Sequence, residues 1–155
     1  MTRPPMPIID SVSVNRSDQK VVVGWPPSTA RDAVGYLVYR FINNNWIPID
    51  TIWGINNTFY KDDAVDPCQK SEAYALATLD SCGNKSLGSF LLPQQSILLN
   101  DVAYSPCDSA NMLTWSPYIN MEPALLGYEI FVSIENGPFQ YSGFTNPGQT
   151  SFTHK

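Results

Sequence analysis

An internal repeat is the feature of this sequence that most constrains its fold. When the chain is compared with itself at a shift of about 90 residues, Trp25 aligns with Trp115 and Pro27 with Pro117. After a short insertion, residues 35–39 (Gly-Tyr-Leu-Val-Tyr) align with residues 127–131 (Gly-Tyr-Glu-Ile-Phe), and Thr58-Phe59 aligns with Ser151-Phe152. A repeat with this period indicates that the chain contains two copies of one structural unit.

Both copies have the pattern of an all-β structure. Short runs of alternating apolar and polar residues are separated by turn residues, and helical periodicity is absent. Pro26-Pro27 ends one run, because proline has no N–H to donate to a neighbouring strand. Asn43-Asn44-Asn45 favours a tight hairpin turn. We predict strands over residues 8–14, 20–25, 36–41, 46–52, 58–61, 73–79 and 86–91.

The second copy has counterparts of the first five predicted strands and none of the last two. We therefore predict an all-β, immunoglobulin-like β-sandwich chain, with a complete domain over 1–92 and a partial second domain over 93–155. Residues 91–96 are expected to act as the linker, stiffened by Pro93. A sandwich that lacks two strands leaves an inner face uncovered. We interpret the chain as a fragment; the alternative is that a partner supplies the strands by β-augmentation.

Certain residues of the first copy resemble a known family. Trp25, the string Gly35-Tyr36-x-Val38-Tyr39 and the string Tyr74-x-Leu76-x-x-x-Asp80-x-x-Gly83 are similar to the pattern of fibronectin type III domains. The resemblance implies that Trp25 is the core landmark and that Tyr74 anchors a hydrogen bond like that of a tyrosine corner. The expected core residues are Trp25, Tyr36, Val38, Tyr74 and Leu76 in the first copy, with Trp115, Tyr128 and Ile130 in the second.

A narrower resemblance concerns residues 74–86, which include Asp80-Ser81-Cys82-Gly83-Asn84. This string resembles modules in large secreted and surface proteins of gliding, Bacteroides-like bacteria. The resemblance implies an extracellular or cell-surface location within a larger protein, with neighbouring domains as partners and a role in adhesion or gliding motility. Thr78 departs from the pattern, which usually has a small alanine there. An inward hydroxyl at Thr78 would need a hydrogen-bond partner.

Short sites for modification follow from the same resemblance. Ser11, Thr51 and Ser109 each follow an aspartate and precede an aliphatic residue or alanine. These tripeptides resemble the sites at which Bacteroides-like exported proteins carry glycans on hydroxyl groups, so they are candidate O-glycosylation sites.

Residues suited to catalysis are scarce. The single histidine, His154, is second from the last residue, which disfavours Ser-His-Asp and Cys-His arrangements as well as histidine-rich metal sites. Asp62, Asp63 and Asp66 form an acidic cluster that could bind calcium weakly. A solvated turn is the favoured interpretation, because the spacing of calcium-binding loops is missing. We predict a non-enzymatic chain with no cofactor and no metal.

The three cysteines leave the disulfide pattern open. Cys68 and Cys82 flank the predicted strand over 73–79, whose length keeps its ends roughly 20 Å apart, whereas bridged Cα atoms lie within about 7 Å. Cys107 lies between the first two strands of the second copy. An odd number of cysteines leaves at least one thiol unpaired or paired outside this chain.

Aromatic residues suggest a contact surface. Four aromatic residues are candidates for a platform on which sugar rings could stack: Trp46, Trp53, Tyr60 and Tyr141. Trp46 aligns with Phe139 in the second copy, which favours a packing role. Trp53 has no aligned counterpart and is the better candidate for an exposed contact residue, although single exposed aromatic residues are common.

The overall charge narrows the choice of partners. The net charge is −5 and charged residues make up 15% of the sequence, so a basic surface for nucleic acid is not expected. No apolar run is long enough to span a membrane, and the first residues do not form a signal peptide. We predict a spacer and protein-interaction module whose loops or strand edges contact a protein or glycan at the cell surface. The alternative is a carbohydrate-binding accessory module of a polysaccharide-degrading enzyme.

Overall fold

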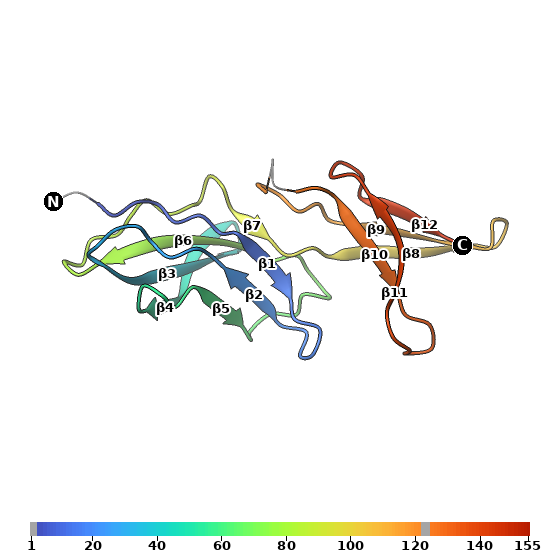
Figure 1. Ribbon diagram of the computed structural model, residues 1–155, viewed down its shortest axis with the longest axis horizontal. Helices are drawn as coiled ribbons and strands as arrows, with labels where there is room; N and C mark the ends of the chain where they lie inside the picture. The colour runs from blue at the N-terminus through green and yellow to red at the C-terminus, as the bar shows by residue number, and fades with distance from the viewer. Residues whose placement is uncertain (1–2, 122–124) are drawn as a thin grey trace. The chain divides into compact units, whose positions relative to one another are not determined.

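The computed structural model describes residues 3–121 and 125–155, and the regular elements in this part of the chain are all β-strands (Figure 1). The all-β prediction is therefore confirmed. The chain divides into two compact units, unit 1 over Met1–Ser96 and unit 2 over Ile97–Lys155. Unit 1 contains β1 (Ser11–Val14), β2 (Val21–Gly24), β3 (Ala33–Ile42), β4 (Asn45–Trp53), β5 (Phe59–Asp62), β6 (Ala73–Asp80) and β7 (Gln94–Gln95). Unit 2 contains β8 (Leu99–Ser105), β9 (Ala110–Trp115), β10 (Tyr128–Val132), β11 (Gln140–Thr145) and β12 (Ser151–His154).

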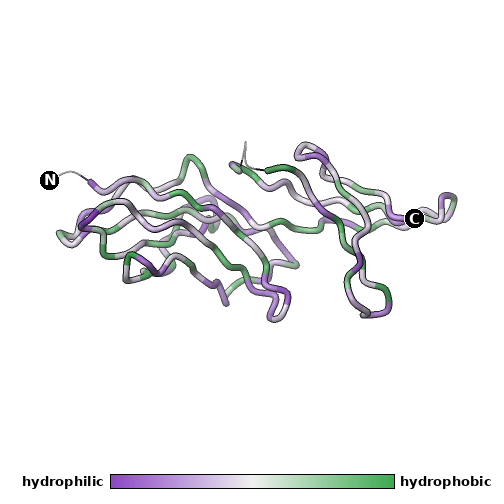
Figure 2. The backbone as a smooth tube through the Cα atoms, in the orientation of Figure 1, coloured by the Kyte–Doolittle hydropathy of each residue, from purple (hydrophilic) through white to green (hydrophobic). Residues whose placement is uncertain are grey.

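Unit 1 is a sandwich of two antiparallel sheets, with strand orders β1-β2-β5 and β4-β3-β6-β7. These are the A-B-E and C′-C-F-G orders of immunoglobulin-like sandwiches. Side chains alternate between the two faces of a strand, so Val21 and Val23 of β2 are buried together with Tyr36 and Val38 of β3. Figure 2 shows a hydrophilic turn between β1 and β2.

The first six predicted strands correspond to β1–β6, whereas the predicted strand over 86–91 is wrong. This part of the chain forms no strand: an isolated bridge pairs Leu79 with Lys85, and the seventh strand lies further on, at Gln94–Gln95. The predicted linker over 91–96 is also wrong in its second half. Gln94 and Ser96 are 1% and 0% exposed, and they belong to the edge of unit 1.

Three serines close the outer edge of β6 in the same way, and they explain the irregular path. Each serine donates its backbone N–H to the carbonyl of one partner residue in β6 or directly before it. The hydroxyl of the serine accepts a hydrogen bond from the backbone N–H of that partner residue. A serine therefore supplies both groups that a paired strand would supply, without continuing the ladder. The pairs are Ser86 with Thr78, Ser89 with Leu76, and Ser96 with Glu72, at distances of 2.9 to 3.0 Å.

Unit 2 has the strand orders β12-β9-β8 and β10-β11, so that β8–β12 take the places of β1–β5. The two units share even an irregularity. The pairing of β3 with β4 shifts register between Val38 and Tyr39, and the pairing of β10 with β11 shifts between Ile130 and Phe131. Trp115, Tyr128 and Ile130 form the buried cluster of unit 2.

The predicted alignment of β5 with β12 is wrong by one residue. The N–H of Trp25 donates to the carbonyl of Thr58, and the N–H of Trp115 donates to that of Thr150, both at 3.1 Å. Thr58-Phe59 therefore corresponds to Thr150-Ser151, and the predicted match to Ser151-Phe152 is wrong. Ile52 and Thr145 are equivalent, because they pair with Tyr36 and Tyr128. Phe59 follows Ile52 by seven positions, whereas Ser151 follows Thr145 by six, and this difference of one residue shifts the alignment.

Candidate functional site

The structure buries all the residues predicted to form the two cores. Trp25 and Tyr36 meet edge-to-face with ring centroids 5.3 Å apart, and Trp115 and Tyr128 repeat this geometry at 5.4 Å. The hydroxyl of Tyr36 accepts a hydrogen bond from the N–H of Ser28 at 2.7 Å, and that of Tyr128 accepts one from the N–H of Tyr118 at 2.9 Å. Val38, Tyr74 and Leu76 are 0% exposed, and Ile130 is 7% exposed. The core positions of unit 1 are scaffold and are not available to a ligand, whereas Trp115, Tyr128 and Ile130 also line an open cavity of unit 2.

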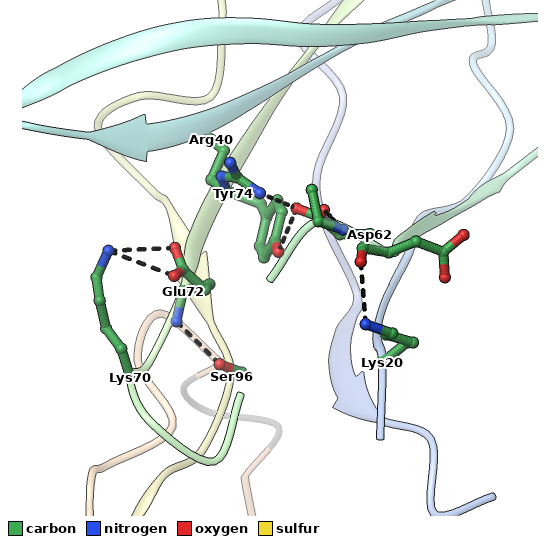
Figure 3. A network of polar contacts seen from close by, with 9 residues as sticks. Lys20, Arg40, Asp62, Lys70, Glu72, Tyr74 and Ser96 are labelled. Atoms are coloured by element: carbon green, nitrogen blue, oxygen red, sulfur yellow. Dashed lines mark hydrogen bonds and ion pairs between the residues drawn. The ribbon is translucent and has the colours of Figure 1, made fainter. Parts of the chain in front are cut away.

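Tyr74 takes part in a buried polar network rather than in a bond to the backbone (Figure 3). Its hydroxyl donates to Asp62 Oδ2 at 2.9 Å, and Arg40 Nη1 pairs with the same oxygen at 2.6 Å. The other carboxylate oxygen of Asp62 accepts the N–H of Ala64 at 3.0 Å. Burial raises the pKa of Tyr74, and the Asp62 carboxylate raises it further. The network joins β5 of one sheet to β3 and β6 of the other.

The acidic cluster predicted at Asp62, Asp63 and Asp66 is divided among separate roles. Asp62 is committed to the network, Asp63 pairs with Lys61 at 3.3 Å, and Asp66 accepts the N–H of Cys68 at 3.0 Å. Within residues 3–121 and 125–155, no three His, Cys, Asp or Glu side chains are grouped so as to hold a metal ion. In the same ranges no helix could cross a membrane.

The string on which the narrower resemblance rests forms a turn held by one carboxylate. Asp80 Oδ1 accepts the N–H groups of Cys82 and Asn84 at 2.9 and 2.8 Å, and its Oδ2 accepts Asn84 Nδ2 at 2.8 Å. Gly83 has φ +80°, which favours glycine. Asp80, Gly83 and Asn84 are thus required by the turn, whereas Cys82 contributes only its backbone.

Cys68, Cys82 and Cys107 are exposed free thiols, and the structure forms no disulfide among them. The candidate glycosylation sites differ in their access to solvent. Ser109 is exposed, whereas Ser11 is half-buried and its hydroxyl donates to Asp10 Oδ1 at 2.9 Å. Thr51 is half-buried and lines the groove described next.

An open groove between β4 and β5 is the best candidate contact surface. It encloses about 480 Å³ and is named here the Trp53 groove. Trp53 ends β4 and Phe59 begins β5, and their side chains are 64% and 66% exposed. The groove is lined by Asp50, Thr51, Ile52, Trp53, Asn57, Phe59, Tyr60 and Lys61.

The loop between the two strands holds the aromatic residues in place. Asn57 Nδ2 donates to the carbonyl of Trp53 at 2.6 Å, and the N–H of Asn57 donates to the carbonyl of Gly54 at 3.1 Å. Gly54 has φ +93°, a conformation that other residues rarely adopt. β4 and β5 are edge strands of different sheets, so the groove lies along one open side of the sandwich.

Polar groups border the aromatic faces. Asp50, Asn57 and Lys61 are exposed in the groove. Lys61 pairs with Asp18 at 2.7 Å as well as with Asp63, so its charge is already balanced. Burial raises the pKa of Tyr60, and nearby carboxylates, including that of Asp50, raise it further. The groove combines exposed rings with hydrogen-bonding groups and has an acidic side.

Unit 2 shows that the fold does not need these aromatic residues. Ser151 takes the place of Phe59, and Asn146 follows Thr145 where Trp53 follows Ile52. Trp53 was predicted as a contact residue, whereas Phe59 was missed because the sequence alignment matched it to Phe152. The alternation in β5 would have indicated it, since Phe59 and Lys61 share the face opposite to buried Asp62.

The other aromatic residues of the predicted platform lie elsewhere. Trp46 packs against Phe41 and Phe90, with ring centroids 5.1 and 5.5 Å apart, and Tyr141 packs against Phe131 at 5.8 Å. His154 Nδ1 lies 2.9 Å from the hydroxyl of Ser142. A serine–histidine contact also requires an orienting group and an oxyanion site before it can act as a nucleophile and base.

Comparisons with known proteins identify structural neighbours only. No protein-family model matches the chain, and no curated protein matches it in sequence. A fibronectin type III-like protein from Clostridium thermocellum is 23% identical, covers 63% of this chain and 93% of its own, and has a TM-score of 0.46. A two-domain fibronectin type III segment of chicken tenascin is 12% identical over 99% of this chain and 82% of its own, with a TM-score of 0.39. The central fibronectin type III array of RIM-binding protein is 13% identical over 96% of this chain, which spans 56% of that array, with a TM-score of 0.41. The strand orders described above give the chain a fibronectin type III-like, immunoglobulin-like β-sandwich fold.

Proposed function

We propose that this chain is a non-catalytic, extracellular spacer and protein-interaction module within a larger bacterial surface or secreted protein, of the kind involved in adhesion or gliding. Its two units are tandem domains of one type, the first complete and the second with the first five strands. The observation that supports an interaction role is the Trp53 groove, whose exposed rings are absent from the equivalent positions of unit 2.

Exposure of these rings to water leaves apolar surface that a partner could bury. Full burial of one large apolar side chain stabilises by about 1.5–3 kcal/mol, and Trp53 and Phe59 leave most of this unused. Tryptophan and tyrosine are also enriched among the residues that dominate binding energies at interfaces. A partner that covers Trp53 and Phe59 would recover the stabilisation that the fold does not use.

A carbohydrate-binding module is the second candidate, and the chemistry of the groove favours it. Ring faces stack on the apolar faces of sugars, while Asp50, Asn57 and Lys61 offer hydrogen-bonding groups to hydroxyls. A glycan attached to Thr51 would occupy the same groove, so modification and binding at this site exclude each other.

The test is a pair of matched substitutions of exposed aromatic residues, Trp53→Ala in the groove and Tyr104→Ala in unit 2, which are 64% and 61% exposed. We expect Trp53→Ala to weaken binding about tenfold or more and Tyr104→Ala to leave it unchanged. Binding of the immobilised chain is measured against bacterial surface and exported proteins, and against insoluble polysaccharides.

The outcomes separate the two candidates. If binding depends on Trp53 and is lost when the target is treated with protease, the protein-interaction role is supported. Trp53-dependent retention on a polysaccharide supports the carbohydrate-binding role. Equal binding by the Trp53→Ala and Tyr104→Ala chains would show that the groove is not a contact surface.

A further inference from the structure

A small cavity in unit 1 has a buried hydroxyl group among its lining residues. It encloses about 160 Å³. One wall comes from residues 5–8, which precede β1, and another comes from residues 26–29, which join β2 to β3. Thr78 of β6 also lines the cavity, which is named here the Thr78 cavity.

The hydroxyl of Thr78 lacks the partner that an inward hydroxyl at this position was expected to need. The side chain is 0% exposed, and its Oγ1 has no hydrogen-bond partner among the described residues. The indole N–H of Trp25 also lacks a partner, but that of Trp115 does too, so this is a shared property of the two cores. An unpaired buried hydroxyl is costly. Its position in the wall of a cavity therefore points to a partner inside that cavity.

The rest of the lining is mostly apolar and carries no charge. Pro5 and Pro7 belong to one wall, and Pro26 and Pro27 belong to the other. Proline has no N–H, so these walls offer carbonyl oxygens and few donors. The N–H of Ser28 is already donated, to the hydroxyl of Tyr36 at 2.7 Å. A charged ligand would lose its hydration here without gaining a counter-charge from the lining. The lining therefore favours an uncharged ligand with a large apolar part.

The volume of the cavity limits the size of the ligand. An apolar cavity of about 150 Å³ holds a molecule of the size of benzene. We propose that the Thr78 cavity binds a small, uncharged ring compound with one hydroxyl group, which is the chemistry of phenol. The ring lies between the two proline-bearing walls, and its hydroxyl forms a hydrogen bond with that of Thr78. The inference is independent of the Trp53 groove.

Water is the competing occupant. A buried water typically makes about three hydrogen bonds to polar groups, and most of this lining is apolar. A phenol instead places its one polar group at Thr78 and its ring against the apolar walls. Met6 and Ile8 of the first wall are 39% and 61% exposed. The ring would cover part of this surface, and removal of apolar surface from water is favourable.

The experiment compares two rings of similar size, phenol and toluene, which differ by a hydroxyl group in place of a methyl group. Each is titrated into the isotope-labelled full chain near pH 7, where a phenol hydroxyl keeps its proton. We expect one phenol to bind per chain, to shift the methyl signals of Met6, Ile8 and Thr78, and to bind about tenfold more tightly than toluene. Benzoate, which is charged, should not bind.

Two substitutions test the hydroxyl of Thr78 itself. Thr78→Val keeps the shape of the side chain and removes an unpaired hydroxyl, so the fold should be retained. Thr78→Ser keeps a hydroxyl. The hydrogen bonds between Thr78 and Ser86 use the backbone of Thr78 and remain in both variants. We expect the preference for phenol over toluene to disappear in Thr78→Val and to persist in Thr78→Ser.

Several results would overturn the proposal. Equal affinity for phenol and toluene, or an unchanged preference in Thr78→Val, would show that the hydroxyl of Thr78 does not select the ligand. Shifts confined to Trp53 and Phe59 would show that the probe stacks only in the Trp53 groove. No saturable shifts at Met6 and Ile8 would show that water alone is the partner of Thr78.

Discussion

Asp62 is a fully buried carboxylate whose charge is stabilised from the opposite sheet. It lies on β5, whereas its partners Arg40 and Tyr74 lie on β3 and β6. Removing one partner of such a pair leaves an uncompensated buried charge, which commonly costs about 3–5 kcal/mol. Unit 2 has Val132 and His154 at the equivalent positions. The network is therefore specific to unit 1, and the fold does not require it.

Because of Tyr74, the free energy of unfolding of unit 1 should depend on pH in the alkaline range. Its pKa in the folded chain is raised above 10.0, by burial first and then by the Asp62 carboxylate. Below pH 10 the tyrosine keeps its proton in the folded and the unfolded chain. Above about pH 10 only the unfolded tyrosine ionises, so the free energy of unfolding should fall by up to about 1.4 kcal/mol per pH unit.

Urea unfolding between about pH 8 and pH 11, followed by the methyl signals of buried Val23, measures this effect in unit 1 alone. In Tyr74→Phe the fall above pH 10 should become smaller, because phenylalanine has no proton to lose. Tyr39 and Tyr60, whose pKa values are also raised, remain in both chains and account for the fall in the free energy of unfolding that remains in Tyr74→Phe. An identical pH profile for both chains would contradict the role given to Tyr74.

At the scale of elements, β6 depends on serine side chains for its outer edge. Ser89 is 2% exposed and its hydroxyl is the acceptor for the N–H of Leu76, which is itself 0% exposed. Ser89→Ala leaves that N–H buried without a partner, and we expect a loss of about 1–3 kcal/mol in the free energy of unfolding. Ser81→Ala, on an exposed side chain next to β6, should change it by less than about 0.5 kcal/mol. Equal losses in denaturant titrations would refute the edge-closing role.

Burial explains which strands could be predicted from the sequence. β1–β6 bury one face, or both, of short alternating runs, and alternation is visible in a sequence. The segment after β6 includes Ser86 and Ser89, whose hydroxyls take the place of the backbone groups of a paired strand. That substitution depends on tertiary contacts and cannot be read from the pattern. Likewise, Trp53 stood out because no residue of the second copy aligned with it. Phe59 was hidden because the spacing between equivalent residues of the two strands differs by one residue between the copies.

At the scale of the whole molecule, the two units differ in how much of their apolar surface they bury. The described part of unit 1 has twelve buried hydrophobic residues, whereas that of unit 2 has four, Ala110, Trp115, Tyr128 and Ile130. Buried apolar area is the main stabilising term in folding. Unit 1 should therefore unfold at higher denaturant concentration than unit 2, and its β3 and β6 amides should exchange most slowly.

The place at which unit 1 ends can be tested by shortening the chain. A chain that stops at Ser96 keeps β7, the buried side chain of Gln94 and the two bonds between Ser96 and Glu72. A chain that stops at Leu92 loses all of them, so that Glu72 and Tyr74 at the start of β6 lose their outer partners. We expect the amides of β3 to be as protected in residues 1–96 as in the full chain, and residues 1–92 to be less stable by about 1–3 kcal/mol. Hydrogen exchange measures both. Equal stability of the two shortened chains would place the end of the unit before Gln94, whereas weaker protection in residues 1–96 than in the full chain would show that unit 2 stabilises unit 1.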